Sequence, residues 1–303
     1  MPRRTCHAAL PGGDSLTVSV VKNMGASVRQ RLLNYAKANN RPFAEVLQYY
    51  AMERFLYRLS ASPHASKFLL KGALLLTVWR APMSRPTMDI DLLGRTSNEV
   101  DDIVNLLKEV AQATVPDDGI TFDLDSFAGS AIREDADYSG VRTVFTGHLN
   151  AARVTMQIDI GFGDVVTPAP EQLAYPTILD FPAPALLGYT RETVIAEKLE
   201  ALVQLRMLNS RMKDYFDIWI LLRHPELDQT VLRAAIERTF KNRKMEIDAA
   251  PIGLSPQFGT DPAKQTQWRA FLKRSALKDA PEQLSVVVEE LRAYFEPIFT
   301  SLV

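Results

Sequence analysis

Two aspartates, Asp89 and Asp91, lie two residues apart in the mainly apolar run from Met88 to Leu93. Side chains of an extended strand alternate between its two faces, so both carboxylates project from the same face. A second alternating run, from Arg153 to Ile160, carries Asp159 on its polar side. If the two strands are neighbours, the three carboxylates converge. Mg²⁺ prefers such oxygen ligands and often bridges to substrate phosphates, so the pattern predicts a site for phosphoryl or nucleotidyl transfer.

A pair of alternating aspartates is weak evidence alone, because any half-exposed strand can carry acidic residues on its solvated face. Asp123 and Asp125 have the same spacing, and we interpret them as a solvated face. The context of Asp89 and Asp91 is different, since Gly72 follows a short predicted strand upstream and opens a predicted helix. Backbone N–H groups at such a position can hold phosphate oxygens.

Lys198 is the third unusual feature, because its helical neighbours form an apolar stripe of Val194, Ala201, Leu202 and Leu205. Lysines avoid such positions unless the ammonium reaches water or finds an anion. Two explanations remain open at this stage, a bound nucleoside triphosphate and a buried carboxylate. In the next predicted helix, Asp214 and Asp217 share a face, and local ion pairing with Arg211 and Lys213 is the interpretation we favour for Asp217.

The elements that position these residues follow from periodicity and from turn residues. We expect a long helix over residues 43–62, a strand at 67–70, a helix at 72–80, a strand at 88–93, a helix at 98–113 capped by Asn98, a strand at 120–127, and a hairpin of 141–149 with 153–160. Five prolines between residues 167 and 184 predict a linker or extended crossover. Helices follow at 190–207, at 211–223 and around 284–291. The predicted fold class is α/β (α+β), with a mixed sheet followed by a mostly helical part from about Gly188.

Composition limits the class of protein. The 303 residues are 47% hydrophobic and 23% charged, which is typical of a globular chain of one large or two smaller domains. A single cysteine, Cys6, and four scattered histidines argue against a disulfide framework and against a cysteine- or histidine-based zinc site. No run of about 18 apolar residues predicts a membrane span, so we expect a soluble cytoplasmic protein.

Charge is balanced in total but segregated along the chain. Residues 1–85 hold 13 Lys or Arg and 3 Asp or Glu, a net of +10, whereas residues 89–137 hold 3 and 13, a net of −10. A basic segment that includes Arg29, Arg31, Lys37 and Arg41 can attract RNA. Mutual neutralisation of the two segments within the fold is the alternative. A second basic group, which can equally be a solvated helix end, consists of Arg238, Lys241, Arg243 and Lys244.

Five stretches together resemble the ordered motifs of the AbiEii/AbiGii-type nucleotidyltransferase toxins. They are Lys71-Gly72-Ala73-Leu74, Arg85-Pro86-Thr87-Met88-Asp89-Ile90-Asp91-Leu92, Asp159, Ala196-Glu197-Lys198-Leu199-Glu200-Ala201-Leu202, and Arg211-Met212-Lys213-Asp214-Tyr215-Phe216-Asp217-Ile218. The motifs extend over about half the chain. This family belongs to the DNA polymerase β-like nucleotidyltransferase superfamily. The resemblance implies a nucleotidyltransferase domain with N-terminal helices over residues 1–187 and a helical domain over 188–303 that completes the active site.

The resemblance also implies a role for each matching residue. Asp89, Asp91 and, less directly, Asp159 would bind Mg²⁺, or Mn²⁺ in its place. Lys198 would contact the triphosphate, and Asp214 would be required for catalysis close to the nucleotide. The remaining residues implied to contact the nucleotide are Lys71, Gly72, Ala73, Arg85 and Thr87. Ala73 departs from the family pattern, which usually has serine or glycine there, so only backbone donors remain at that position.

The activity implied is transfer of a nucleoside monophosphate from an NTP to the 3′ end of an RNA. Similar mycobacterial toxins modify tRNA in this way, which would block translation, and they are typically encoded beside an antitoxin. Three alternatives remain open. They are nucleotidylation of a protein hydroxyl, a nucleotide-binding module without turnover, and a metal-dependent nuclease, which would have no need for a buried lysine aligned to a triphosphate. Whether Asp159 is a metal ligand or the base for the attacking hydroxyl also remains open.

Overall fold

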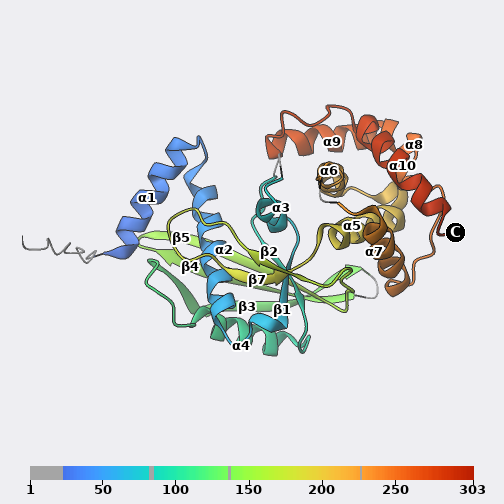
Figure 1. Ribbon diagram of the computed structural model, residues 1–303. Coiled ribbons are helices and arrows are strands. Elements are labelled where there is room, and N and C mark those ends of the chain that lie inside the picture. The colour runs from blue at the N-terminus through green and yellow to red at the C-terminus, as the bar shows by residue number, and fades with distance from the viewer. Residues whose placement is uncertain (1–22, 82–84, 136–137, 226) are drawn as a thin grey trace, which may run out of the picture.

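The computed structural model describes residues 23–81, 85–135, 138–225 and 227–303, so Cys6 lies outside the described residues. A seven-stranded sheet forms the centre of the first part of the chain, and Figure 1 shows the C-terminal helices grouped at one side of it. The sheet order is β3-β4-β5-β2-β1-β7-β6. The strands are β1 (Phe68–Lys71), β2 (Ile90–Gly94), β3 (Ile120–Asp135), β4 (Tyr138–Leu149), β5 (Ala152–Phe162), β6 (Glu171–Ala174) and β7 (Ala185–Gly188).

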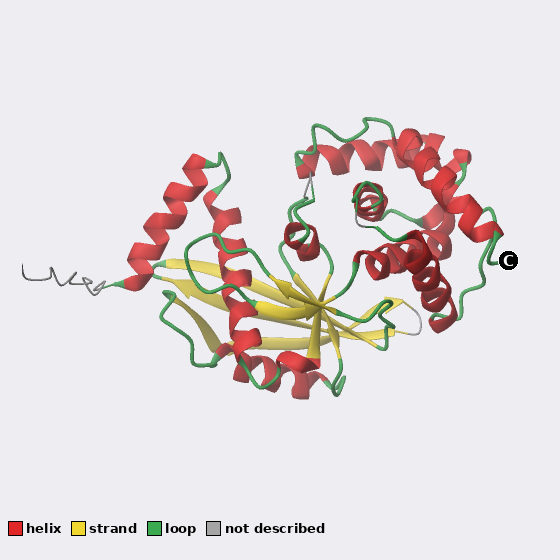
Figure 2. Ribbon diagram, in the orientation of Figure 1, coloured by secondary structure: helices red, strands yellow, loops and turns green. Residues whose placement is uncertain are grey.

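The sheet is mixed. Strand β2 runs parallel to β5 and antiparallel to β1, and β1 runs parallel to β7. The remaining neighbours, β3 with β4, β4 with β5 and β6 with β7, are antiparallel. Figure 2 shows the strands as one layer with helices on its faces and at its end. The α/β class with a mixed sheet, predicted from the sequence, is confirmed.

Among the described residues of the first part of the chain, four segments are α-helical: α1 (Met24–Ala38), α2 (Phe43–Ala61), α3 (Leu74–Val78) and α4 (Val100–Ala111). Helix α2 packs on the sheet through Phe55, whose ring centroid lies 5.4 Å from that of Phe122 and 5.2 Å from that of Phe145. Its buried Arg58 also forms a 2.7 Å salt bridge with Asp118, just before β3. Apolar contact and a paired buried charge therefore fix this helix.

The second part is helical and contains α5 (Arg191–Leu205), α6 (Met212–Leu221), α7 (Gln229–Asn242), α8 (Pro256–Thr260), α9 (Pro262–Ser275) and α10 (Leu284–Thr300). Helix α5 begins after Thr190, whose hydroxyl accepts from the N–H of Thr193, and such a cap stabilises a helix start. Within the described part of the chain, no helix is both long and apolar enough to cross a bilayer.

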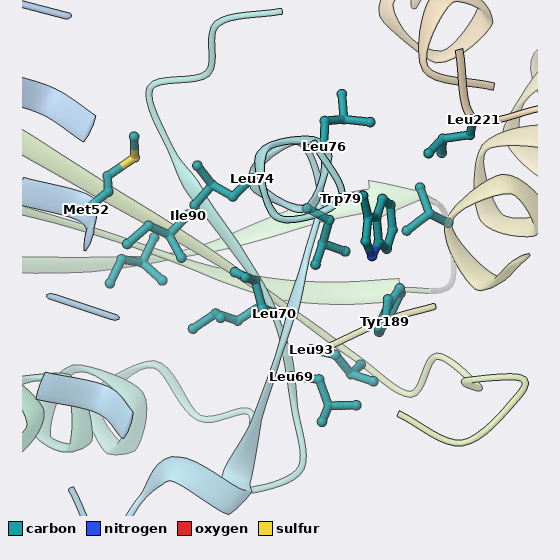
Figure 3. Packing of buried hydrophobic residues seen from close by; sticks show 14 of the residues in the cluster. Met52, Leu69, Leu70, Leu74, Leu76, Trp79, Ile90, Leu93, Tyr189 and Leu221 are labelled. Carbon is teal, nitrogen blue, oxygen red and sulfur yellow. The ribbon is translucent and has the colours of Figure 1, made fainter. Parts of the chain in front are cut away.

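One continuous hydrophobic core joins the two parts. It contains Leu70 of β1 and Ile90 of β2 together with Leu199 of α5 and Phe216 of α6. Figure 3 shows the region around β1, β2 and α3, with Leu69, Leu70, Leu74 and Ile90 among its labelled side chains. A domain boundary at 187/188 stays a prediction.

Four local expectations were wrong. The helix predicted at 72–80 is only the five-residue α3, because the chain first turns at Gly72, where φ is +75°, and Ala73 offers no side-chain cap. The helix predicted at 98–113 begins at Val100, and Glu99 rather than Asn98 occupies the N-cap position. The proline-rich segment contains strand β6, which pairs with β7. Strand β2 starts at Ile90, so Met88 precedes it with 57% of its surface exposed.

Glu53 of α2 is a buried carboxyl that is held against the segment before β7. It accepts a 2.7 Å hydrogen bond from the N–H of Ile178, and its other oxygen lies 2.8 Å from the guanidinium of Arg54. Burial raises the pKa of Glu53 to about 7, although Arg54 acts in the opposite direction. Folding therefore takes up a proton at this group between the ordinary pKa of 4.5 and the folded value of about 7.

We predict that Glu53→Gln reduces the pH dependence of stability. The folded pKa is raised, so the contribution of protonated Glu53 is fully present below pH 4.5 and is lost as the pH rises through about 7. Between pH 5 and pH 8, the free energy of unfolding of the wild-type protein should fall by about 1 to 3 kcal/mol more than that of the variant. Urea unfolding at both pH values measures this difference, and equal losses in the two proteins would contradict the assignment.

Candidate active site

Four charged side chains lie in register across four adjacent strands. Lys71 of β1 is paired with Asp91 of β2, Asp91 with Asp159 of β5, and Asp159 with Arg142 of β4. Since residues in register on neighbouring strands point to the same face, the sheet places two carboxylates side by side between two cations. The convergence that the sequence predicted for Asp91 and Asp159 is therefore present in the fold.

Asp89, which immediately precedes β2, joins this row. One carboxylate oxygen from each of Asp89, Asp91 and Asp159 lies within 4.8 Å of the others. The hydroxyl of Thr87 donates to the carboxylate of Asp89. Burial and the charge of Asp89 raise the pKa of Asp91 to about 6. Three acidic groups at this separation repel one another, and a divalent cation with oxygen ligands offsets that repulsion. The cluster can therefore bind a metal ion.

Gly72 allows the chain to pass close to the cluster. Its φ is +75°, and a Cβ atom built on it would lie 1.9 Å from Oδ2 of Asp91. No side chain fits there while Asp91 keeps its position, so glycine is required both by the backbone conformation and by the available space. Ala73 follows in the right-handed helical region and shares the same wall.

The opposite wall is formed by α5 and α6. The ammonium of Lys198 lies 2.8 Å from Oδ1 of Asp214 and 2.9 Å from Oδ2 of Asp217. Burial opposes the charged form of Lys198, but the two aspartates outweigh burial and raise its pKa. Burial likewise opposes ionisation of Asp214 and Asp217, yet the charge of Lys198 holds the pKa of both below the ordinary value. The apolar stripe around Lys198 thus reflects a buried ion pair at the edge of the cleft.

The expectation of local pairing for Asp217 was wrong. Asp217 accepts two hydrogen bonds from Arg85, Nε at 2.8 Å and Nη2 at 2.9 Å, across 132 residues of sequence. Asp217 points into the core, where its exposed fraction is 1%, whereas Lys213 on the same helix is exposed. Asp214 does pair locally, since Nε of Arg211 lies 2.9 Å from its Oδ2. Arg85 thus links the chain segment before β2 to helix α6.

The two walls enclose a cleft of about 530 Å³. Nine of the ten site residues proposed from the sequence line it: Lys71, Gly72, Ala73, Arg85, Asp89, Asp91, Asp159, Lys198 and Asp214. Thr87 is buried behind them and reaches the cleft through its bond to Asp89. Their individual roles stay predictions, but the structure brings them into one place.

The sequence did not single out several further residues that line the cleft: Arg142, Tyr189 and Glu197, together with Arg211, Lys213 and Arg243, which were noted only as basic neighbours. Burial raises the pKa of Glu197 to about 7. Arg142 lies on a strand with no charge motif, and its only sequence signal is its place in the alternating hairpin.

Arg243 is not part of a solvated basic group, because its guanidinium lies 2.6 Å from Glu200 and 3.0 Å from Asp164. Lys71 also approaches Asp164, at 3.2 Å, so these residues form a second charged network beside the first. Arg243 and Lys71 thereby connect helix α7 to the sheet at the edge of the cleft.

We predict that Gly72→Ala destabilises the protein by about 1 to 3 kcal/mol and displaces Asp91, because the new methyl group overlaps its carboxylate. Stabilisation by a divalent cation should be lost in the same variant. Gly25→Ala in α1 is the control with the smaller overlap, because its Cβ would lie 3.2 Å from the backbone oxygen of Gly119, and it should destabilise the protein less than Gly72→Ala and leave the effect of the cation unchanged. Urea unfolding with and without Mn²⁺ tests both effects, and wild-type behaviour of Gly72→Ala would refute the steric argument.

No curated protein matches the chain. Among solved structures, JHP933 from Helicobacter pylori shows 15% identity over 82% of this chain and 89% of its own, with a TM-score of 0.46. A candidate nucleotidyltransferase from H. pylori shows 16% identity over 82% of this chain and 92% of its own, with a TM-score of 0.42.

The family model described as "Nucleotidyl transferase AbiEii toxin, Type IV TA system" matches residues 54–296. That range begins within α2 and ends within α10, so it includes both walls of the cleft and most of the chain. Asp89, Asp91, Lys198 of α5 and Asp214 of α6 all fall inside it. The chain therefore belongs to the AbiEii nucleotidyltransferase toxin family.

Proposed function

We propose that the protein transfers a nucleoside monophosphate from an NTP to the 3′ end of an RNA, in particular the acceptor stem of a tRNA, and thereby blocks translation. The observation that carries this proposal is the arrangement of the cleft. Three carboxylates on the sheet face a wall that contains Lys198, Arg211 and Lys213. A metal-bound triphosphate is the substrate whose charges complement both walls.

The carboxylates fit a hard divalent cation, because all the donors are oxygens and their separation allows one ion to reach all three. We assign Mg²⁺ to Asp89, Asp91 and Asp159, with Mn²⁺ as a substitute. When bound, the ion offsets the negative charge of the phosphates and of the departing pyrophosphate. Thr87 orients Asp89 through its hydroxyl, and Gly72 keeps the space beside Asp91 open.

The cationic wall binds the triphosphate in this proposal. Lys198 is held in position by Asp214 and Asp217, so its ammonium is oriented before the nucleotide arrives. Asp214 contributes by fixing both Lys198 and Arg211. The backbone at Gly72 and Ala73 offers N–H donors to phosphate oxygens. Such preorganised groups lower the barrier because little reorganisation is needed during the reaction.

The transfer itself is a substitution at phosphorus. The 3′-hydroxyl oxygen of the acceptor forms a bond to the α-phosphorus, the bond from that phosphorus to the bridging oxygen of the β-phosphate breaks, and pyrophosphate leaves with the electron pair. The hydroxyl proton passes to water. We assign Asp159 to the metal and not to the base, because one of its oxygens lies within 4.8 Å of those of Asp89 and Asp91.

The choice of RNA as acceptor rests on the family and on charge. Three of the four basic residues named in the N-terminal segment are engaged within the fold, Arg29 with the ring of Phe43, Arg31 with Asp180 and Arg41 with Glu45, while Lys37 is exposed. Arg58 with Asp118 joins the basic segment to the acidic one. The exposed Lys213 and half-exposed Arg211 at the cleft add positive charge beside the reacting centre. A protein hydroxyl is the alternative acceptor, and a cognate antitoxin is the partner expected for a toxin of this family.

We predict that Asp89→Asn lowers nucleotidyl transfer by about 10²-fold or more while the protein stays folded, because a neutral amide cannot hold the metal. Asp123→Asn is the matched control, since Asp123 has the same strand spacing to Asp125 but lies exposed on β3. Release of pyrophosphate from labelled NTP measures the rate. Wild-type turnover by Asp89→Asn, or an equal loss in Asp123→Asn, would exclude the assigned metal site.

We predict that purified protein with Mg²⁺ and each of four labelled NTPs labels RNA of tRNA length in total cellular RNA. Periodate oxidation of the RNA beforehand should abolish the label, because it destroys the 3′-terminal diol. Labelling should also fall steeply with salt, as expected where phosphates are bound. Label found on protein instead would favour the alternative acceptor, and nucleotide binding without pyrophosphate release would indicate a module that has lost turnover.

A further inference from the structure

Arg142 is the cation that lies against the carboxylate cluster from the β4 side. Its Nε donates to Oδ1 of Asp159 at 2.8 Å and its Nη2 donates to Oδ2 at 2.7 Å. The side chain of Arg142 is 41% exposed, whereas that of Asp159 is 9% exposed. The guanidinium therefore contacts a nearly buried carboxylate from the cleft. Because Arg142 is much more exposed than Asp159, its side chain can change position while Asp159 stays in place.

We propose that Arg142 competes with the divalent cation for Asp159 and so makes metal binding depend on the nucleotide. This inference rests on the proposed function and adds a regulatory property to the same cleft. In the free protein, the guanidinium supplies the positive charge next to the three carboxylates. The divalent cation replaces it, and the displaced guanidinium pairs with the phosphates of the bound NTP in the cleft that Arg142 already lines.

The hydrogen bonds of Asp159 favour competition between Arg142 and the cation over a role of Arg142 in holding Asp159 in place as a metal ligand. Both oxygens of Asp159 accept from Arg142, and Nε2 of Gln157 lies 3.3 Å and 3.2 Å from the same two oxygens. Asp159 thus has donors on each oxygen in the state that the structure describes. A cation that binds the carboxylate directly must displace at least part of this set and must also overcome repulsion from the guanidinium.

Lys71, at the other end of the charged row, behaves differently. Its ammonium lies 3.2 Å from Asp164, and its charge opposes the rise in the pKa of Asp91 that burial and Asp89 cause. Lys71 is 7% exposed and belongs to the second network with Arg243. Arg142 is therefore the flanking cation that both contacts a predicted metal ligand and has enough exposure to leave it.

The nucleotide resolves the competition in this proposal. Removing Arg142 from Asp159 without a new anion would leave two cations close together, which disfavours metal alone. A triphosphate supplies oxygens that match the forked guanidinium, so metal and nucleotide bind with positive coupling. If Arg142 only held Asp159 in place, its removal would instead weaken metal binding.

Titration with Mn²⁺ alone, followed by electron paramagnetic resonance of the free ion, separates these possibilities. We expect Arg142→Ala to bind Mn²⁺ about fivefold or more tightly than wild type, the lower end of ordinary coupling between sites. Arg142→Lys, which keeps a charge without the fork, should fall between them. Arg153→Ala is the matched control, because Arg153 is an exposed arginine six residues before Asp159 on the same strand. The affinity of this variant for Mn²⁺ should equal that of wild type.

The outcomes distinguish this inference from the proposed function. Asp89→Asn should lose Mn²⁺ binding, and if it binds as wild type does, the metal site itself is wrong. If Asp89→Asn loses binding but Arg142→Ala binds equally or more weakly than wild type, the competition is refuted while the metal site stands. A melting temperature for Arg142→Ala close to that of wild type excludes loss of fold, and the Arg142→Lys variant repeats the test if the alanine variant unfolds.

Discussion

Repulsion among Asp89, Asp91 and Asp159 is the constraint that the rest of the structure accommodates. Three carboxylate oxygens within 4.8 Å are unfavourable in a partly buried site, and burial together with the charge of Asp89 raises the pKa of Asp91 to about 6. Several features of the fold keep them together. Sheet register aligns Asp91 with Asp159, glycine at position 72 leaves the space that Asp91 needs, and Arg142 contributes an opposite charge. A large core around the sheet supplies the stability that permits such a site.

The cations on the opposite wall of the cleft, formed by α5 and α6, are likewise paired with carboxylates of the protein itself. Arg85 is buried and Lys198 is mostly buried, and they share Asp217, so neither charge is left without a counterion. Because Arg85 comes from the segment before β2 and Asp217 from α6, this pair also connects the sheet to the helices that complete the cleft. Loss of Asp217 would leave buried Arg85 without this carboxylate, whereas Lys198 would keep Asp214, so Asp217 matters mainly for the connection between the sheet and the helices.

Sequence patterns predicted the features that depend on neighbouring residues, such as which side chains share one face of a strand or helix. Alternation placed Asp89 and Asp91 on one face, and helical periodicity placed Lys198 on an apolar stripe, as the structure confirms. The match to a family model confirmed the resemblance that the combined motifs suggested. What failed depends on distant partners. No local pattern shows that Arg85 meets Asp217 across 132 residues, or that β4 brings Arg142 beside Asp159. The length of α3 depends on the turn at Gly72, which the apolar run alone does not reveal.

Most of the charged groups that line the cleft are paired with other charged groups of the protein. Its cations already hold carboxylates: Arg142 holds Asp159, Lys198 holds Asp214 and Asp217, and Arg243 holds Asp164 and Glu200. Under the proposed function, a metal-bound triphosphate brings both signs of charge, so its entry would exchange partners within the cleft, whereas exposing isolated buried ions would cost far more. A metal ion or a nucleotide alone would offer only half of that exchange. Selectivity for the complete metal–nucleotide complex would then follow from the ion pairs that the cleft already contains.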